Sequence, residues 1–209
     1  GLMTTSCCPS YVAFIEKNFP ELVQHISHSV SPMIMTAQLI KHSDPTAKCV
    51  FIGPCASKKA EFKLEKTGGA IDCVMSFEEL QAFLDARGID TVDCEDTVLD
   101  NGSFYGRIFA KSGGIVQGLL DVAKELNVEG LKPIVMSGID ECKANLMKLK
   151  FGKATENFFE GMACEGGCLN GPLCITHSPR NIVDVDKFGN EAKEKTIYNS
   201  VKLYEMTKE

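Results

Sequence analysis

The stretch Cys164-Glu165-Gly166-Gly167-Cys168 decides this sequence, and it lies in a longer frame that reads Glu160-x-Met162-x-Cys164-x-x-Gly167-Cys168-x-x-Gly171. Two segments far upstream carry further cysteine motifs, Thr5-Ser6-Cys7-Cys8-Pro9 and Pro54-Cys55-x-x-Lys58-x-x-Glu61. None of the three has the Cys-x-x-Cys spacing of a zinc ribbon. Four thiolates gathered from three distant loops favour an iron–sulfur cluster buried between structural elements.

Size and composition indicate a large globular domain with reduced cysteines. The chain has 209 residues, 44% of them hydrophobic, and a formal charge of −6. It lacks a basic stretch with interleaved aromatics, which argues against a nucleic-acid partner. Its apolar runs are too short for a membrane span, and its N-terminus has no signal pattern. Ten cysteines without an export signal predict free thiols in the cytoplasm. Because Gly1 lies so close to the first motif, we expect further sequence upstream.

The apolar periodicity predicts strands alternating with helices. Strands are expected at 48–53 (buried), 71–75, 132–137 and 157–162. Helices are expected from Pro9 to about Phe19, from the capping box Ser76-x-x-Glu79 to Gly88, from Gly113 to Leu126, over 139–149, and in the tail from 191 to 206. This order predicts an α/β fold of mostly parallel twisted sheets flanked by helices, with the cluster held by loops between lobes. Cys55 and Cys164 both follow strands, where such folds bind ligands.

Cys8, Cys55, Cys164 and Cys168 are the natural thiolate quartet of a 4Fe–4S cube. Gly166 and Gly167 are expected to let the backbone approach a bulky cluster. Cys7 and Cys8 precede a predicted helix, whose N-terminus should lower their pKa values. The alternatives are a zinc site from the same cysteines, or plain buried cysteines.

The three motifs, in this order, resemble those of the catalytic domain of iron-only (FeFe) hydrogenases. The resemblance runs from Thr5 to Gly171, and Phe109-x-x-Ser112-Gly113-Gly114 resembles a glycine-rich segment that this family carries between its second and third motifs. It implies that residues 1–209 are the C-terminal part of an H-cluster domain, with an upstream lobe and ferredoxin-like domains missing.

The resemblance also implies a cofactor, the H-cluster, in which a 4Fe–4S cube is joined to a two-iron unit with CO, cyanide and aza-dithiolate ligands. Cys8, Cys55 and Cys164 would hold the cube, and Cys168 would bridge to the two-iron unit. Cys7 would carry a proton as a free thiol, or would merely be a small buried hydrophobe. Lys58 would donate a hydrogen bond to cyanide, and Glu61 would pair with Lys58 or would be a solvated side chain. Met162 would pack against the two-iron unit or would fill the core. Pro54 and Ser57 would lie beside the cofactor.

The implied function is the reversible oxidation of H2 to protons and electrons by an iron hydrogenase. Ferredoxin or fused iron–sulfur domains would carry the electrons, and maturation proteins would supply the two-iron unit. Departures from the family pattern, expected to surround the two-iron pocket, stand at Gly53 (usually Met), Tyr11 (usually Trp) and Pro172 (usually in a glycine run). They would suit a hydrogen sensor with slow turnover. A non-enzymatic relative resembling the cytosolic iron–sulfur assembly and prelamin-recognition proteins is the third alternative.

Some residues match the pattern weakly or not at all. Ser27 stands where the family places a serine of its proton path, and it is expected on a helix. Cys49 and Cys73 are expected in the core, and the acidic stretch 93–96 in a solvated loop. Three further cysteines are assigned no role, namely Cys94, Cys142 and Cys174.

Overall fold

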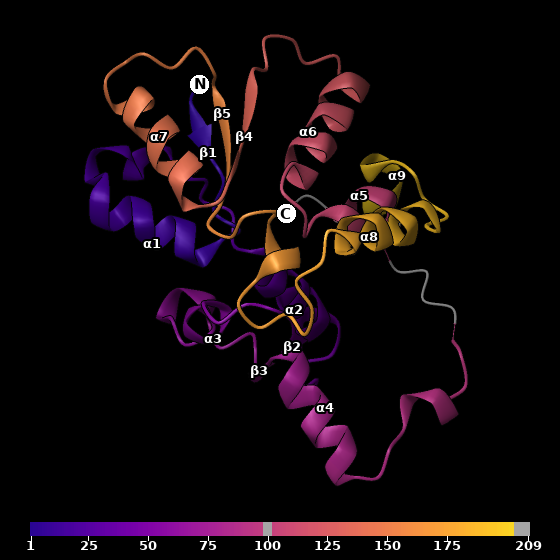
Figure 1. Cartoon of the computed structure of the whole chain (residues 1–209). Helices are drawn as coiled ribbons and strands as arrows, with labels where there is room; N and C mark the ends of the chain where they lie inside the picture. Colours follow the sequence, from indigo (N-terminus) through magenta and orange to yellow (C-terminus); the bar gives the residue numbers. More distant parts are fainter. Residues whose placement is uncertain (98–101, 203–209) are drawn as a thin grey trace.

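The computed structural model describes residues 1–97 and 102–202, and it confirms an α/β fold with parallel strands (Figure 1). Its strands form two separate sheets. The three-stranded sheet has the order β1-β5-β4, and its strands are β1 (Met3–Thr4), β5 (Phe158–Met162) and β4 (Pro133–Ser137). The two-stranded sheet pairs β2 (Val50–Ile52) with β3 (Cys73–Met75).

The helices surround both sheets, and the sequence predicts four of them. The α-helices are α1 (Pro9–Asn18), α2 (Pro32–Ser43), α3 (Lys58–Glu61), α4 (Phe77–Ala86), α5 (Phe104–Ile108), α6 (Gly114–Glu125), α7 (Ile139–Lys150), α8 (Arg180–Asn190) and α9 (Ile197–Lys202). The 3-10 turns are η1 (Pro20–His25), η2 (Glu65–Thr67), η3 (Thr91–Asp93) and η4 (Cys168–Asn170). The predictions for α1, α4, α6 and α7 are confirmed. The predicted tail helix is wrong in extent, because α9 covers only its middle and residues 203–206 lie outside the described residues.

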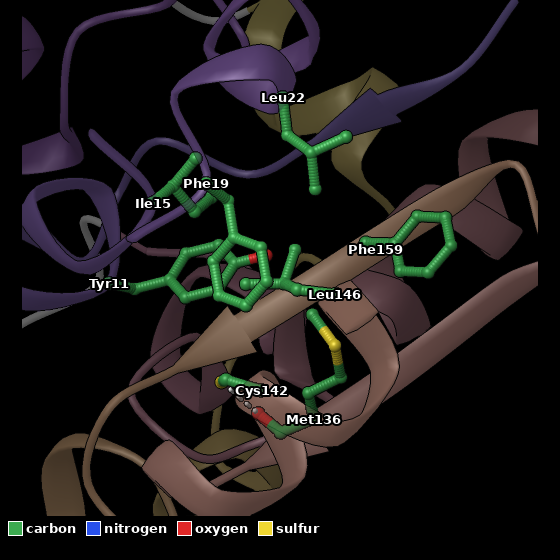
Figure 2. Packing of buried hydrophobic residues seen from close by; sticks show 8 residues of the cluster. All are labelled: Tyr11, Ile15, Phe19, Leu22, Met136, Cys142, Leu146 and Phe159. Carbon is green, nitrogen blue, oxygen red and sulfur yellow. Dashed lines mark hydrogen bonds between the residues drawn. The ribbon is translucent and has the colours of Figure 1, made fainter. Parts of the chain in front are cut away.

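The larger core fills the space between the three-stranded sheet and helices α1 and α7. Figure 2 shows Phe159 of β5 and Met136 of β4 meeting side chains of α1, η1 and α7. Tyr11 lies at its centre, fully buried, with its hydroxyl 2.7 Å from Thr4 Oγ1. A Cβ at Gly161 would lie 2.3–2.5 Å from the Tyr11 ring, so this strand residue must be glycine. Tyr11 is therefore a core residue, and the expectation that this departure surrounds the two-iron pocket stays a prediction.

The two-stranded sheet is less covered than the sequence indicates. Val50 and Ile52 are 51% and 40% exposed, so the prediction of a buried strand is wrong. Cys73 is exposed as well, whereas Cys49 is buried beside Ala37 of α2. Because successive strand side chains point to opposite faces, only one face of this sheet packs against α2. The exposed 93–96 loop agrees with its prediction. In the described part of the chain, no helix is long and apolar enough to cross a membrane.

Asp72 ties this sheet to α2, and its titration gives a first prediction. Its carboxylate accepts the Cys49 N–H (2.8 Å) and pairs with Lys41 (2.9 Å), and these bonds lower its pKa from 3.8 to about 2. A lowered folded pKa stabilises the protein above about pH 3.8, and this stability is lost as the pH falls toward 2. We expect Asp72→Asn to lower the thermal midpoint at pH 5 to 7 and to leave it nearly unchanged at pH 2. Wild-type and variant curves that stay parallel over this range would refute the assignment.

Candidate metal centre

The first cysteine motif lies where β1 passes into α1. Cys8 is the N-cap residue of α1, and Pro9 is its first helical residue, as predicted. Burial, together with the neighbouring thiols Cys8 and Cys168, raises the pKa of Cys7 to about 12 and outweighs the lowering by Lys58. The expectation that the helix N-terminus lowers the pKa is therefore wrong for Cys7, because removing a thiolate from water costs more than the helix end returns.

The second motif follows β2 and folds back onto the first. Cys55 comes three residues after the strand, as predicted, and Lys58 begins the short helix α3. Lys58 is 7% exposed; its Nζ donates to Glu61 Oε2 (2.6 Å) and to the carbonyl oxygen of Cys7 (3.2 Å). The Lys58–Glu61 pair is thus buried, and the solvated alternative is wrong. Ser57 Oγ is hydrogen-bonded to Ser10 Oγ, so a second contact joins these two motifs.

Lys59, the neighbour of Lys58 in the sequence, is partly exposed to solvent. Its ammonium pairs with Glu79 on α4, and both side chains remain about one-third exposed or more. Two adjacent lysines therefore lie in different surroundings, since Lys58 contacts the first cysteine motif and Lys59 is partly solvated.

The third motif is a tight loop after β5, and its glycines are required by the fold of the chain itself. Gly166 and Gly167 have φ of 78° and 83°, a region that glycine favours. A Cβ at Gly167 would lie 2.6 Å from the Ser112 nitrogen, and one at Gly166 would lie 2.8 Å from Asn170 Nδ2. In this structure the close approach is thus between the loop and the protein's own atoms.

The third loop also contacts the second motif. A Cβ at Gly171 would lie 2.4 Å from the Pro54 carbonyl oxygen, which accepts the Leu173 N–H at 3.1 Å. The described polar contacts of Pro54 are therefore with the cysteine loop. Met162 is 3% exposed at the end of β5, which leaves both of its predicted roles open.

Cys164 and Cys168 both lie within electrostatic reach of Cys8 and Cys55. Cys8 and Cys55 raise the pKa of both Cys164 and Cys168, in each case after burial as the largest cause. All ten cysteines are free thiols, as predicted. In the residues described, no three His, Cys, Asp or Glu side chains are spaced to hold one metal ion.

A buried hydroxyl and a cavity lie beside the cysteine motifs. Ser112 Oγ, beside the third loop, is buried and has no hydrogen-bond partner within the described residues. A cavity of about 180 Å³ is lined by Cys7, Ser6, Ser27 and Phe109, among others. The donor set is four thiols from three loops, which is the ligation a 4Fe–4S cube uses. The residues present therefore fit the implied cluster.

Ser27 and two residues without an assigned role complete the site. Ser27 shares the cavity with Cys7, but it lies after η1 and not on a helix. Cys174 donates to the carbonyl oxygens of Leu169 (3.2 Å) and Cys168 (3.5 Å), and it raises the pKa of Cys164. Glu160 is fully buried on β5. Glu160 could have been noticed in the sequence, because it is a charged residue inside an otherwise apolar strand. Nothing in the sequence indicated that Cys174 lies near Cys164 and Cys168.

The chain is similar to several known proteins. Residues 1–172 match the family model described as "Iron only hydrogenase large subunit, C-terminal domain". Iron hydrogenase 1 of Clostridium pasteurianum is 29% identical over 227 residues, covering 88% of this chain and 40% of that protein. The periplasmic Fe hydrogenase large subunit of Nitratidesulfovibrio vulgaris is 28% identical over 210 residues, covering 80% of this chain and 50% of that protein. The chain thus spans half or less of these relatives.

Two further similarities concern a shorter region and the fold. The cytosolic Fe-S cluster assembly factor NAR1 of Kluyveromyces lactis is 38% identical over 90 residues, covering 43% of this chain and 19% of that protein. A solved structure of the FeFe-hydrogenase HydA1 from Chlamydomonas reinhardtii superposes with a TM-score of 0.72 at 21% identity, covering 98% of this chain and 71% of that one. The latter confirms the fold.

Proposed function

The chain belongs to the family defined by the C-terminal domain of the iron-only hydrogenase large subunit, and we propose that it interconverts H2 with protons and electrons at an H-cluster. Cys8, Cys55 and Cys164 would hold the cube, and Cys168 would join it to the two-iron unit. The observation that carries this proposal is that three loops bring four thiols into one region. Each of these loops is joined to another by a polar contact.

When bound, the cofactor supplies the redox chemistry that splits or forms H2. The chain's own part is to hold the group and to move a proton. Cys7 is adjacent to the proposed ligand Cys8 but is not itself needed as a ligand. It lines the cavity of about 180 Å³. A thiol in that position is suited to exchange a proton with a base inside the site, and Ser27 lines the same cavity.

Lys58 holds a positive charge inside the site. Its ammonium has three donors, and two of them are used by Glu61 and the Cys7 carbonyl. The third is free to donate a charge-assisted hydrogen bond to a cyanide ligand. Glu61 compensates the buried charge and fixes the ammonium. Pro54, Ser57 and Met162 would lie beside the cofactor.

Electrons and the two-iron unit must come from other proteins in this proposal. We expect a ferredoxin, or iron–sulfur domains fused to the chain, as the electron partner, and maturation proteins as the source of the two-iron unit. The protein is expected to act in the cytoplasm.

The similarity to NAR1 over 90 residues supports a second candidate, a cluster-binding assembly factor without the two-iron unit. The buried Lys58 speaks against it, because a cube alone leaves the third donor of a buried ammonium without an anionic partner.

Infrared spectroscopy separates these functions. The chain is reconstituted anaerobically with iron and sulfide, and a synthetic two-iron dithiolate precursor is then added. We expect about four iron ions per chain before this addition, followed by sharp CO and cyanide bands that shift under H2. Cys94→Ser, which changes an exposed cysteine outside the site, serves as the control and should behave like the wild type.

The outcomes discriminate clearly. Bands that shift under H2 with rapid turnover support the enzyme, and the same bands with slow turnover support a sensor. An intact cube without such bands supports the assembly factor. A chain that binds one zinc ion and no iron would refute all three.

A further inference from the structure

Glu160 is the most buried carboxylate of the described residues, and the proposed reaction does not use it. It lies on β5, four residues before Cys164, with 0% exposure. Its Oε1 accepts the Gly113 N–H and its Oε2 accepts the Val116 N–H, both at 2.7 Å. Every described contact of these two oxygens is with an N–H donor, which favours the carboxylate form. Burial raises its pKa, and the backbone donors oppose this rise.

These contacts place Glu160 at the start of α6. The first N–H groups of a helix have no partner within the helix. The N-cap residue of α6 is Gly113, which has no side chain to satisfy them. The carboxylate from β5 therefore replaces the missing cap and fixes the start of α6 to the three-stranded sheet.

The segment just before α6 in turn holds the third cysteine loop. The Ala110 carbonyl oxygen accepts the Cys168 N–H at 2.8 Å, and the Ser112 N–H donates to the Gly166 carbonyl oxygen at 3.2 Å. The Gly114 N–H donates to the Lys111 carbonyl oxygen, closing the turn into the helix. A fixed helix start therefore fixes residues 110–112, and these fix the backbone of Cys168.

We propose that Glu160 is a positioning residue for Cys168, acting through the start of α6 and the segment 109–113. The importance of Cys168 in this inference rests on the proposed function, whereas the mechanical link can be measured without any cluster.

The test compares Glu160→Gln with Glu165→Gln. Both variants lose one negative charge on or near the same loop, but Glu165 is exposed. Glutamine at 160 keeps the shape and presents an amide NH2 to one of the two N–H donors, which removes that bond. The cluster-free proteins are treated with iodoacetamide, and modification of each cysteine is followed by peptide mass spectrometry. Cys142 and Cys49, which are 0% and 6% exposed, report on general unfolding.

In Glu160→Gln we expect Cys168 to react roughly 10-fold faster or more, because the loop opens more often, with Cys142 and Cys49 unchanged. Glu165→Gln should match the wild type. After reconstitution, the midpoint potential of the cube should be more positive in Glu160→Gln, since a buried negative charge has been removed. Equal Cys168 rates in all proteins, or a parallel rise at Cys142, would overturn the proposal.

Two measurements cover the case in which Glu160→Gln fails to fold. Glu160→Asp keeps both oxygens on a shorter side chain and should give an intermediate Cys168 rate. In the wild type, hydrogen exchange at the Gly113 and Val116 amides should be as slow as in the interior of α6; rapid exchange at these first-turn amides would refute the contact. A chain that takes up no iron refutes the proposed function but leaves this inference to be decided by the alkylation rates.

Discussion

Replacing Gly167 by alanine is expected to prevent assembly of the cysteine site and to lower the free energy of unfolding by at least about 3 kcal/mol. The residue has φ 83° and ψ −154°, a combination open essentially only to glycine. A Cβ there would also lie 2.6 Å from the Ser112 nitrogen and 2.7 Å from the Ala110 carbonyl oxygen. Both neighbours are backbone atoms of the segment that holds Cys168, so relief of the clash moves the proposed ligand.

The measurements are urea unfolding of the cluster-free chain and iron content after anaerobic reconstitution. Gly152→Ala is the matched control, since Gly152 also has a positive φ (65°) but has no atom within 4 Å of the added Cβ. We expect this control to lose about 1 kcal/mol from backbone strain alone and to bind iron normally. Equal losses in the two variants would mean that the close packing of the third loop contributes nothing beyond backbone strain.

The comparison of sequence with structure shows which signals are local. The capping box at Ser76 and Glu79 is present with both reciprocal bonds, because its hydrogen bonds lie within a few residues of the chain. The strand β5 was also predicted, and so was the position of Cys164 after it, since a short, mostly apolar segment ends there. By contrast, α2 begins at Pro32 after Ser31 and was missed, although proline is favoured in the first helical turn.

The failed site predictions depend on long-range contacts. The lowered pKa expected for Cys7 followed from the adjacent helix end, whereas burial under distant segments sets the actual direction. The role of Glu160 needed the positions of Gly113 and Val116, more than 40 residues away in the chain. The contacts of the third-loop glycines with the chain's own atoms were not predicted, because only the folded chain shows what lies against them, and their expected approach to a cluster stays a prediction.

The position of Cys7 in the cavity predicts a large loss of hydrogen turnover when its thiol is replaced. We expect Cys7→Ser to reduce hydrogen turnover by at least about 100-fold, since a positioned proton donor contributes roughly that much and a serine hydroxyl is a far weaker acid than a thiol. The substitution preserves size, and the Cys7 carbonyl still accepts the Lys58 ammonium because that contact uses the backbone. Iron content, the cube signal and the CO and cyanide bands should therefore match those of the wild type. The measurement is H2 evolution with a reduced dye, next to the infrared spectrum of the same sample.

Lys58→Met provides the contrast that gives this result meaning. It removes the buried ammonium together with its bonds to Glu61 and to the Cys7 carbonyl, so it should lose the two-iron bands themselves and leave Glu61 as an uncompensated buried charge. If Cys7→Ser loses turnover but keeps the infrared bands, the thiol transfers the proton. If Lys58→Met loses the bands, the ammonium retains the cofactor. If Cys7→Ser instead turns over at the wild-type rate, Cys7 is a small buried packing residue and the proton leaves by another group.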